Sequence, residues 1–121
     1  MSCVFCDIQD YIVENELAYA IYDINAVSEG HALVCLKRHI ASFFEITEEE
    51  DRAIWSAVRE LKTVLDEIYS PDAFNIGINN GAAAGQTIPH LHVHVIPRYH
   101  GDMERPEGGV RGVIPEKRTY L

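Results

Sequence analysis

Apolar residues recur along the chain with two different periods, which separates predicted strands from one predicted helix. Alternating or continuous apolar runs predict strands at 18–22 and 31–37. The segment between them, 23–30, contains the turn-forming residues Asp23, Asn25, Ser28 and Gly30. The two strands are therefore expected to form an antiparallel hairpin with a long loop.

A long helix is predicted after this hairpin. Thr47 followed by Glu50 fits a capping box, in which Thr47 is the N-cap and Glu50 reaches back to it. The helix is expected to end at Ser70 and Pro71. The apolar positions spaced one, three or four apart in this segment are Ile54, Trp55, Val58, Leu61, Leu65 and Ile68.

Two more strands are predicted, at 74–79 and 90–96, with a loop of small residues between them and Pro97 as the end of the second. The tail from Gly101 onward is rich in Gly, Pro and charge and is expected to be irregular. Successive strands, one long helix and no alternation of strands with helices predict an α+β fold with an antiparallel sheet.

Length, composition and charge indicate the size of the fold and the kinds of partner to expect. A length of 121 residues, 47% of them apolar, favours a single domain over 1–121. The net charge of −9 argues against a nucleic-acid partner bound by general electrostatics, although a pocket can still hold a phosphate through amides and histidines. The sequence shows no signal-peptide pattern and no apolar run of about 20 residues, so a cytoplasmic protein without a membrane partner is expected.

Three of the six histidines lie at alternate positions of one predicted strand: His90, His92 and His94. Alternate residues of a strand share a face, so their imidazoles are expected to line a cleft while the apolar residues between them face the core. The three could bind a catalytic metal, or they could share the work of phosphoryl transfer. The amides, glycines and hydroxyl of 79–87 favour transfer, because such groups hold phosphate oxygens without adding a competing charge.

The run Gly85-Gln86-Thr87, followed by histidines at 90, 92 and 94 and apolar residues between them, resembles the motif of the histidine triad (HIT) family of nucleotide hydrolases and transferases. Segments 3–6, 23–24, 30–34, 37–40 and 97–99 are also similar to the family, so the resemblance covers nearly the whole chain. It implies a HIT-like fold with about five antiparallel strands, one long helix and a short one, assembled as a homodimer.

The resemblance also implies roles at the site. His92 is expected to attack the α-phosphate of a nucleotide, with a purine favoured, and to form a nucleotidyl-histidine intermediate that water resolves to a nucleoside monophosphate. Its other ring nitrogen should donate to a backbone carbonyl. His94 should assist the leaving group, and His31 should orient or polarise another histidine. The residues expected to contact the nucleotide are Asp23 (at the ribose), Asn79, Gln86, Thr87 and His94, with Gln86 also counted as catalytic.

A structural zinc ion is predicted apart from this chemistry, and no organic cofactor. Cys3 and Cys6 offer two thiolates, and the resemblance implies that His39 and His90 complete a tetrahedral site. The third cysteine, Cys35, lies in an apolar run and is expected to be a buried thiol.

Several alternatives stay open at this point. Asp23 could serve only to stabilise its turn, and Arg98 could form a charge behind the site or a surface ion pair. The tail could place Arg111 or Lys117 near distal phosphates, or pack on a partner subunit. The substrate could be a dinucleoside polyphosphate, a nucleoside phosphoramidate, an adenylylated conjugate or a nucleotide sugar. The rival functions are a nucleotide-binding regulatory module with weak activity and a metal-dependent hydrolase that uses the three histidines as ligands.

Overall fold

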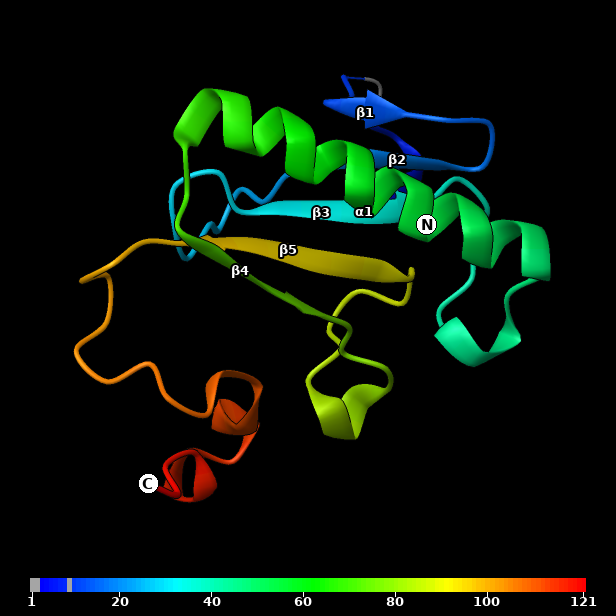
Figure 1. Cartoon of the computed structure of the whole chain (residues 1–121). Coiled ribbons are helices and arrows are strands. Elements are labelled where there is room, and N and C mark those ends of the chain that lie inside the picture. Colours follow the sequence, from blue (N-terminus) through cyan, green and yellow to red (C-terminus); the bar gives the residue numbers. More distant parts are fainter. Residues whose placement is uncertain (1–2, 9) are drawn as a thin grey trace.

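The computed structural model describes residues 3–8 and 10–121, and its centre is an antiparallel sheet with one face covered by a long helix (Figure 1). The five strands have the spatial order β1-β2-β3-β5-β4, so the last strand inserts between two earlier ones. This arrangement confirms the predicted α+β class. The elements are β1 (Val13–Glu14), β2 (Ala18–Tyr22), β3 (Ala32–Leu36), α1 (Glu48–Tyr69), β4 (Ala73–Gly77) and β5 (His92–Arg98).

The predicted hairpin is present as β2 and β3. Ala18 pairs with Leu36 at one end and Tyr22 with Ala32 at the other. The loop closes where the amide of Asp23 donates to the carbonyl of His31 at 3.0 Å. This closure brings Asp23 and His31 to the same end of the hairpin, where the site described below lies.

Helix α1 begins with the predicted capping box. The Thr47 hydroxyl accepts from the Glu50 amide at 3.1 Å, and the Thr47 amide donates to the Glu50 carboxylate at 2.9 Å. Arg38 adds two hydrogen bonds of 2.8 Å to the same carboxylate, which is almost fully buried. Four of the predicted apolar positions, Ile54, Val58, Leu61 and Leu65, are buried against the sheet, whereas Ile68 is exposed.

The two faces of the sheet have different covers. Leu91, Val93 and Val95 face α1 in the main core. The opposite face carries a smaller apolar cluster that includes Phe5, Leu33 and Cys35, and the N-terminal segment covers it in part. Cys35 is fully buried, as predicted, and burial raises the pKa of its thiol to about 12. The candidate site lies on this second face.

Proline 97 does not end its strand, contrary to the prediction. Strand β5 continues through Pro97 to Arg98 because β3 ends where Ala32 pairs with Val95, so only β4 flanks the last residues of β5. A proline lacks an amide proton, and at this position its carbonyl accepts from the Ser28 hydroxyl at 2.6 Å.

Other boundaries also differ from prediction. Strand β3 lacks His31 and Lys37, and β4 runs from Ala73 to Gly77 rather than to Asn79. The two-residue strand β1 was not predicted, because it is too short to show an alternation. The expected second, short helix is not an α-helix in the described residues, where 3-10 turns such as Phe43–Glu45 occur instead. None of the helices in this part of the chain is both long and apolar enough to cross a bilayer.

Candidate active site

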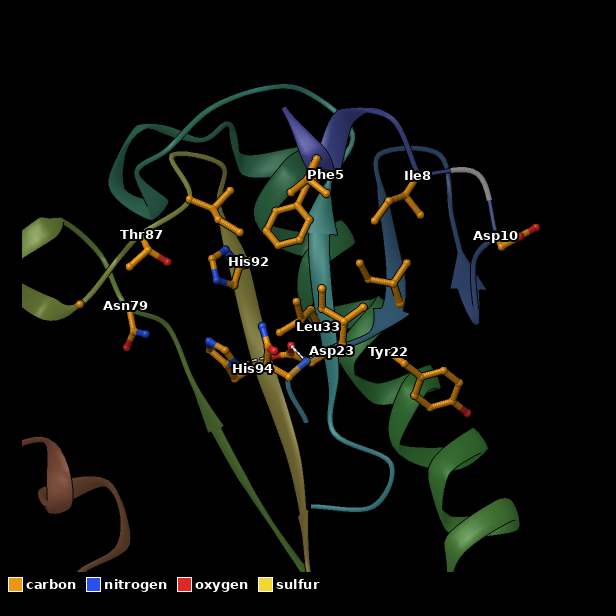
Figure 2. Close-up of a pocket in the computed structure, with 16 residues that line it drawn as sticks. Phe5, Ile8, Asp10, Tyr22, Asp23, Leu33, Asn79, Thr87, His92 and His94 are labelled. Carbon is orange, nitrogen blue, oxygen red and sulfur yellow. Dashed lines mark hydrogen bonds and ion pairs between the residues drawn. The ribbon is translucent and has the colours of Figure 1, made fainter. Parts of the chain in front are cut away.

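His92 and His94 project from β5 into a cavity of about 560 Å³ on the less covered face of the sheet (Figure 2). The third histidine of the motif does not join them. His90 precedes the strand and is fully buried, so the expectation that all three imidazoles line one cleft is wrong for His90. The N-terminal segment and the hairpin form a mostly apolar wall, whereas the loop between β4 and β5 forms a polar one. The lining residues include Val4, Phe5, Ile8, Ile21, Asp23, Leu33, Asn79 and Thr87.

One ring nitrogen of His92 is fixed by the backbone. Its Nδ1 lies 2.8 Å from the carbonyl oxygen of His90. Since a carbonyl can only accept, Nδ1 carries the proton and Nε2 of the neutral ring keeps its lone pair. This is the hydrogen bond that the sequence predicted. The ring is 9% exposed and meets the ring of Phe5 edge-on, with centroids 5.0 Å apart.

His94 has the opposite tautomer, set through His31. The amide of Val27 donates to Nδ1 of His31 at 3.1 Å, so the proton of a neutral His31 is on Nε2. That Nε2 lies 3.0 Å from Nδ1 of His94, which therefore accepts. His94 is left with an N–H at Nε2. The site thus combines a lone pair on His92 with a hydrogen-bond donor on His94.

Asp23 stands beside this pair of histidines. Its Oδ2 lies 3.5 Å from Nε2 of His31 and 4.0 Å from Nδ1 of His94. Its other oxygen accepts from the amide of Asn25 at 2.8 Å, so the turn-stabilising role is present as well. Because the carboxylate also lines the cavity, its turn contact does not exclude a contact with a ligand.

Burial keeps both of these imidazoles neutral. It lowers the pKa of His31 and of His94 below the ordinary 6.5, and Asp23 opposes that effect in each case. The neighbouring His92 and His31 lower the pKa of His94 further. Neutral rings at pH 7 are what the hydrogen-bond chain from Val27 to His94 requires.

Asp23, His31 and His94 are also close enough together to hold a metal ion. The chain of donors argues against it. His31 uses its Nδ1 lone pair to accept from Val27, so only a doubly deprotonated ring could offer Nε2 to a metal. The three histidines of the motif, for their part, do not form such a group among the described residues. The geometry therefore favours a hydrogen-bonded pair of imidazoles over a metal-activated water.

A different group fits zinc. The sulfur atoms of Cys3 and Cys6 lie 3.4 and 3.5 Å from Nδ1 of His90, and Nδ1 of His39 lies 3.4 Å from Cys6 and 3.1 Å from His90. Tetrahedral zinc with ordinary bond lengths separates its nitrogen and sulfur ligands by about 3.6 Å and two nitrogen ligands by about 3.3 Å. His90 donates from Nε2 to the carbonyl of Leu36 at 2.6 Å, which leaves Nδ1 free to ligate. The four predicted ligands are thus together and correctly spaced.

Gln86 is placed differently from the prediction. Its amide nitrogen donates to the carbonyls of Ala41 and Ile88 at 3.1 and 3.2 Å, and its oxygen accepts from the amide of Gly81 at 2.9 Å. With its hydrogen-bonding groups engaged in this way, the side chain does not line the cavity. Gln86 instead holds the loop that presents Thr87, which does line it together with Asn79.

A second cavity, of about 470 Å³, lies on the other side of His94 and shares His94 and Asn79 with the first. The tail forms one wall through Met103, Val110, Val113 and Arg118. Arg98 lines it but makes two 2.8 Å hydrogen bonds to Asp102, so it forms an ion pair. Arg111 donates to the carbonyl of Lys117, and neither residue lines this cavity. The tail cation at the cavity is therefore Arg118, which the sequence did not single out.

A family model described as HIT domain matches residues 8–101. The chain belongs to the histidine triad family. Among HIT relatives, a bis(5'-adenosyl)-triphosphatase of Dictyostelium discoideum is 36% identical over 89 residues, which are 74% of this chain and 60% of that protein. A bifunctional bis(5'-adenosyl)-triphosphatase/adenylylsulfatase of Arabidopsis thaliana is 29% identical over 115 residues, 95% of this chain and 63% of that protein. The chain thus spans less than two thirds of either relative.

Solved HIT structures agree with the fold. A HIT-family protein of Bacillus subtilis matches with a TM-score of 0.78 and 32% identity, over 97% of this chain and 89% of that chain. A Zn-bound histidine triad protein of Mycobacterium smegmatis matches with a TM-score of 0.76 and 34% identity, over 86% of this chain and 80% of that chain. A zinc-bearing relative therefore exists with the same fold.

Two features of this HIT site were not found from the sequence. Phe5 packs on the ring of His92, but between two cysteines its side chain gives no sign of that position. The amide of Val27 fixes a histidine tautomer, and no residue type marks such a backbone contact. In contrast, six residues that were predicted from the sequence lie at the two cavities. They are Asp23, His31, Asn79, Thr87, His92 and His94.

Proposed function

We propose that this HIT protein hydrolyses nucleotides at the α-phosphorus, with an adenosine 5'-phosphoryl group as the part it recognises and His92 as the nucleophile. The observation that carries the proposal is the pair of opposite tautomers, a lone pair on His92 beside an N–H on His94. The triphosphatase and adenylylsulfatase relatives support it, because both names give substrates in which an adenosine 5'-phosphoryl group is joined to a different second group.

The first cavity suits the nucleoside. Its apolar wall, with Ile21 and Leu33 near the loop end of the hairpin, would hold a purine, and Asp23 would accept from the ribose hydroxyls. The α-phosphate would then lie between His92 and His94, with Asn79 and Thr87 donating to its oxygens. The leaving group would extend past His94 into the second cavity.

In the first step, Nε2 of His92 forms a bond to phosphorus while the bond to the leaving-group oxygen breaks and that oxygen takes the electron pair. The carbonyl of His90 accepts from Nδ1–H and stabilises the positive charge that the ring gains. His94 donates a hydrogen bond to the leaving oxygen as its charge grows. In the second step, the oxygen of a water molecule attacks phosphorus, the bond from phosphorus to Nε2 breaks and the nitrogen recovers its electron pair. The proton that the water loses passes to solvent, and the nucleoside monophosphate leaves.

Replacement of the nucleophile tests this function. We expect His92→Ala to lower turnover of a bis(5'-adenosyl) triphosphate by at least ~10³-fold while nucleotide binding persists, since the covalent path is lost. His100→Ala is the matched control, because His100 is an exposed histidine outside both cavities, and its turnover should equal that of the wild type. If His92→Ala keeps more than a tenth of the wild-type rate, the proposal is wrong.

We also propose that zinc occupies the group formed by Cys3, Cys6, His39 and His90. The support is the donor set and its spacing, together with the Zn-bound relative. Bound zinc would supply a structural cross-link between the N-terminal segment and the sheet, with no part in the phosphoryl chemistry. The cytoplasmic location stays a prediction from the sequence, as does the single domain over 1–121.

A further inference from the structure

The short 3-10 turn at Val4–Cys6 belongs to the metal group and to the nucleotide cavity at once. Cys3 and Cys6, two of the four candidate metal ligands, lie at its two ends. Between them, Val4 and Phe5 line the cavity. Figure 2 shows the ring of Phe5 next to His92, at the end of the cavity that the N-terminal segment forms. The candidate metal ligands and the cavity-lining residues are therefore neighbours within one turn of chain.

Phe5 is the point of contact with the nucleophile. Its side chain is 6% exposed, and its ring meets the ring of His92 at 5.0 Å and 64°, and that of His90 at 5.8 Å and 86°. Edge-on packing of this kind fixes the orientation of both partners. Phe5 thus limits how far the ring of His92 can turn away from its hydrogen bond to the backbone.

His90 makes a second link between the two sites. Its Nδ1 faces the two sulfurs, and its Nε2 donates to Leu36. Its carbonyl oxygen accepts from Nδ1 of His92 and so fixes the tautomer of the nucleophile. One residue therefore offers a ligand atom to the metal and an acceptor to the catalytic ring.

Among residues 3–8 and 10–121, few other bonds hold the turn. Its N-cap has no side-chain hydrogen bond there, and the hydrogen bonds of its main chain are Cys6 N–H to Cys3 O at 2.9 Å and the Tyr19 hydroxyl to the carbonyl of Phe5. A three-residue turn with so few bonds has little stability of its own. A tetrahedral ion joining both of its ends to His39 and His90 would immobilise it.

We infer that metal occupancy of the Cys3/Cys6/His39/His90 group controls the active site. Phe5 is the positioning residue through which occupancy affects the nucleotide cavity. The His90 carbonyl is the group through which occupancy affects the tautomer of His92. The part concerning nucleotide affinity rests on the proposed function. The part concerning the His92 tautomer does not, because it can be measured without substrate.

The experiment compares zinc-loaded and chelator-stripped protein by elemental analysis, by calorimetric titration with adenosine monophosphate, and by ring ¹⁵N spectra of the histidines. Loaded protein should hold one zinc per chain and show His92 with its proton on Nδ1 alone. Stripping should lower the affinity by roughly tenfold and add the other tautomer, and zinc should restore both.

Phe5→Ala keeps all four ligands, so it separates the turn from the metal. We expect it to retain zinc yet bind the nucleotide roughly tenfold more weakly, with little further loss on stripping, because effects that pass through one residue do not add. Phe5→Leu should recover part of the affinity. Phe44→Ala is the matched control, since Phe44 is 82% exposed and lines neither cavity.

The inference is overturned if the protein holds no zinc, if stripped wild type keeps its affinity and the His92 tautomer, or if loaded Phe5→Ala binds as tightly as wild type. Should removal of zinc unfold the chain, the nucleotide affinities of zinc-loaded Phe5→Ala and zinc-loaded Phe5→Leu decide. Weaker binding by Phe5→Ala supports the inference, and equal binding overturns it. If zinc changes affinity and tautomer but no substrate is turned over, the proposed function fails while this inference stands.

Discussion

Each imidazole that faces the proposed α-phosphate has one ring nitrogen engaged, and that contact assigns a role to the other. His92 donates to the backbone and keeps a lone pair, whereas His94 accepts from His31 and keeps a proton. Neither role follows from being a histidine, because the two rings are chemically identical when free. A main-chain carbonyl and a main-chain amide make the difference.

Asp23 provides a test at this scale. Its carboxylate raises the pKa of His31 and His94 against the lowering effect of burial. Without that charge the protonated forms are less stable, so both pKa values fall further. We therefore expect Asp23→Asn to move the acid limb of the kcat profile to lower pH. An acid limb that stays in place or moves to higher pH would contradict this, with Asp66→Asn on α1 as the control.

Residue types in a pattern predicted most of this site. The alternation of His90, His92 and His94 predicted imidazoles at a cleft, and the cysteine spacing pointed to the metal group. The resemblance to the HIT family added His92 as the proposed nucleophile. Gln86 shows the limit. Its position in the motif suggested a phosphate contact, but its amide is satisfied by three backbone groups, those of Gly81 and Ile88 in its own loop and that of Ala41 in the segment before α1. A sequence does not show which partner a polar side chain will find.

Among the elements, α1 depends most on one side chain. The carboxylate of Glu50 closes the capping box and accepts two bonds from Arg38, and chiefly that arginine lowers the pKa of Glu50 from 4.5 to about 2. A lowered pKa in the folded state adds stability above pH 4.5, and this contribution is lost as the pH falls from 4.5 toward 2.

We accordingly expect Glu50→Gln to reduce the free energy of unfolding by about 1 kcal/mol at pH 7, because it weakens the cap and the charged hydrogen bonds. The difference from wild type should shrink below pH 4.5. Urea unfolding at pH 7 and pH 4 measures both. Glu60→Gln, an exposed position on the same helix, should have almost no effect. Equal stability of Glu50→Gln and wild type at pH 7 would show that the cap is unimportant.

The strands show which element boundaries a sequence can define. The helix start was predicted to the residue because a capping box is a local pattern. The end of β5 was not, because the effect of Pro97 depends on which neighbouring strand is still paired at that row. The same holds for the tail, where Gly and Pro predicted irregular chain and the structure has two 3-10 turns at Gly109–Val113 and Pro115–Lys117.

At the scale of the molecule, the two faces of the sheet differ: one forms the main core, and the other carries the candidate active site. One face packs on α1 (Figure 1), and the other carries two cavities that share His94 and Asn79, the first of which is drawn in Figure 2. Under the proposed function, a nucleoside cavity beside a separate leaving-group cavity would let related chains share an adenylyl group and differ in what they release. Arg118 and the apolar tail residues are where this chain would make that choice.

A homodimer stays a prediction at this scale. Strand β4 lies at an edge of the sheet, and Ile76 on it is 45% exposed, which leaves a surface that a second copy could cover. We expect light scattering after size exclusion to give twice the chain mass of 13.6 kDa. A single-chain mass at micromolar concentration would contradict it.

The covalent intermediate tests the central claim most directly. Rapid quench during turnover of a bis(5'-adenosyl) triphosphate, followed by peptide mapping, should find an adenylyl group on the peptide that contains His92, labile to acid and stable to base as a phosphoramidate is. The group should be absent from His92→Ala and present in His100→Ala. Turnover by the zinc-loaded wild type with no such adduct at any time point would contradict the account and favour the metal-dependent hydrolase.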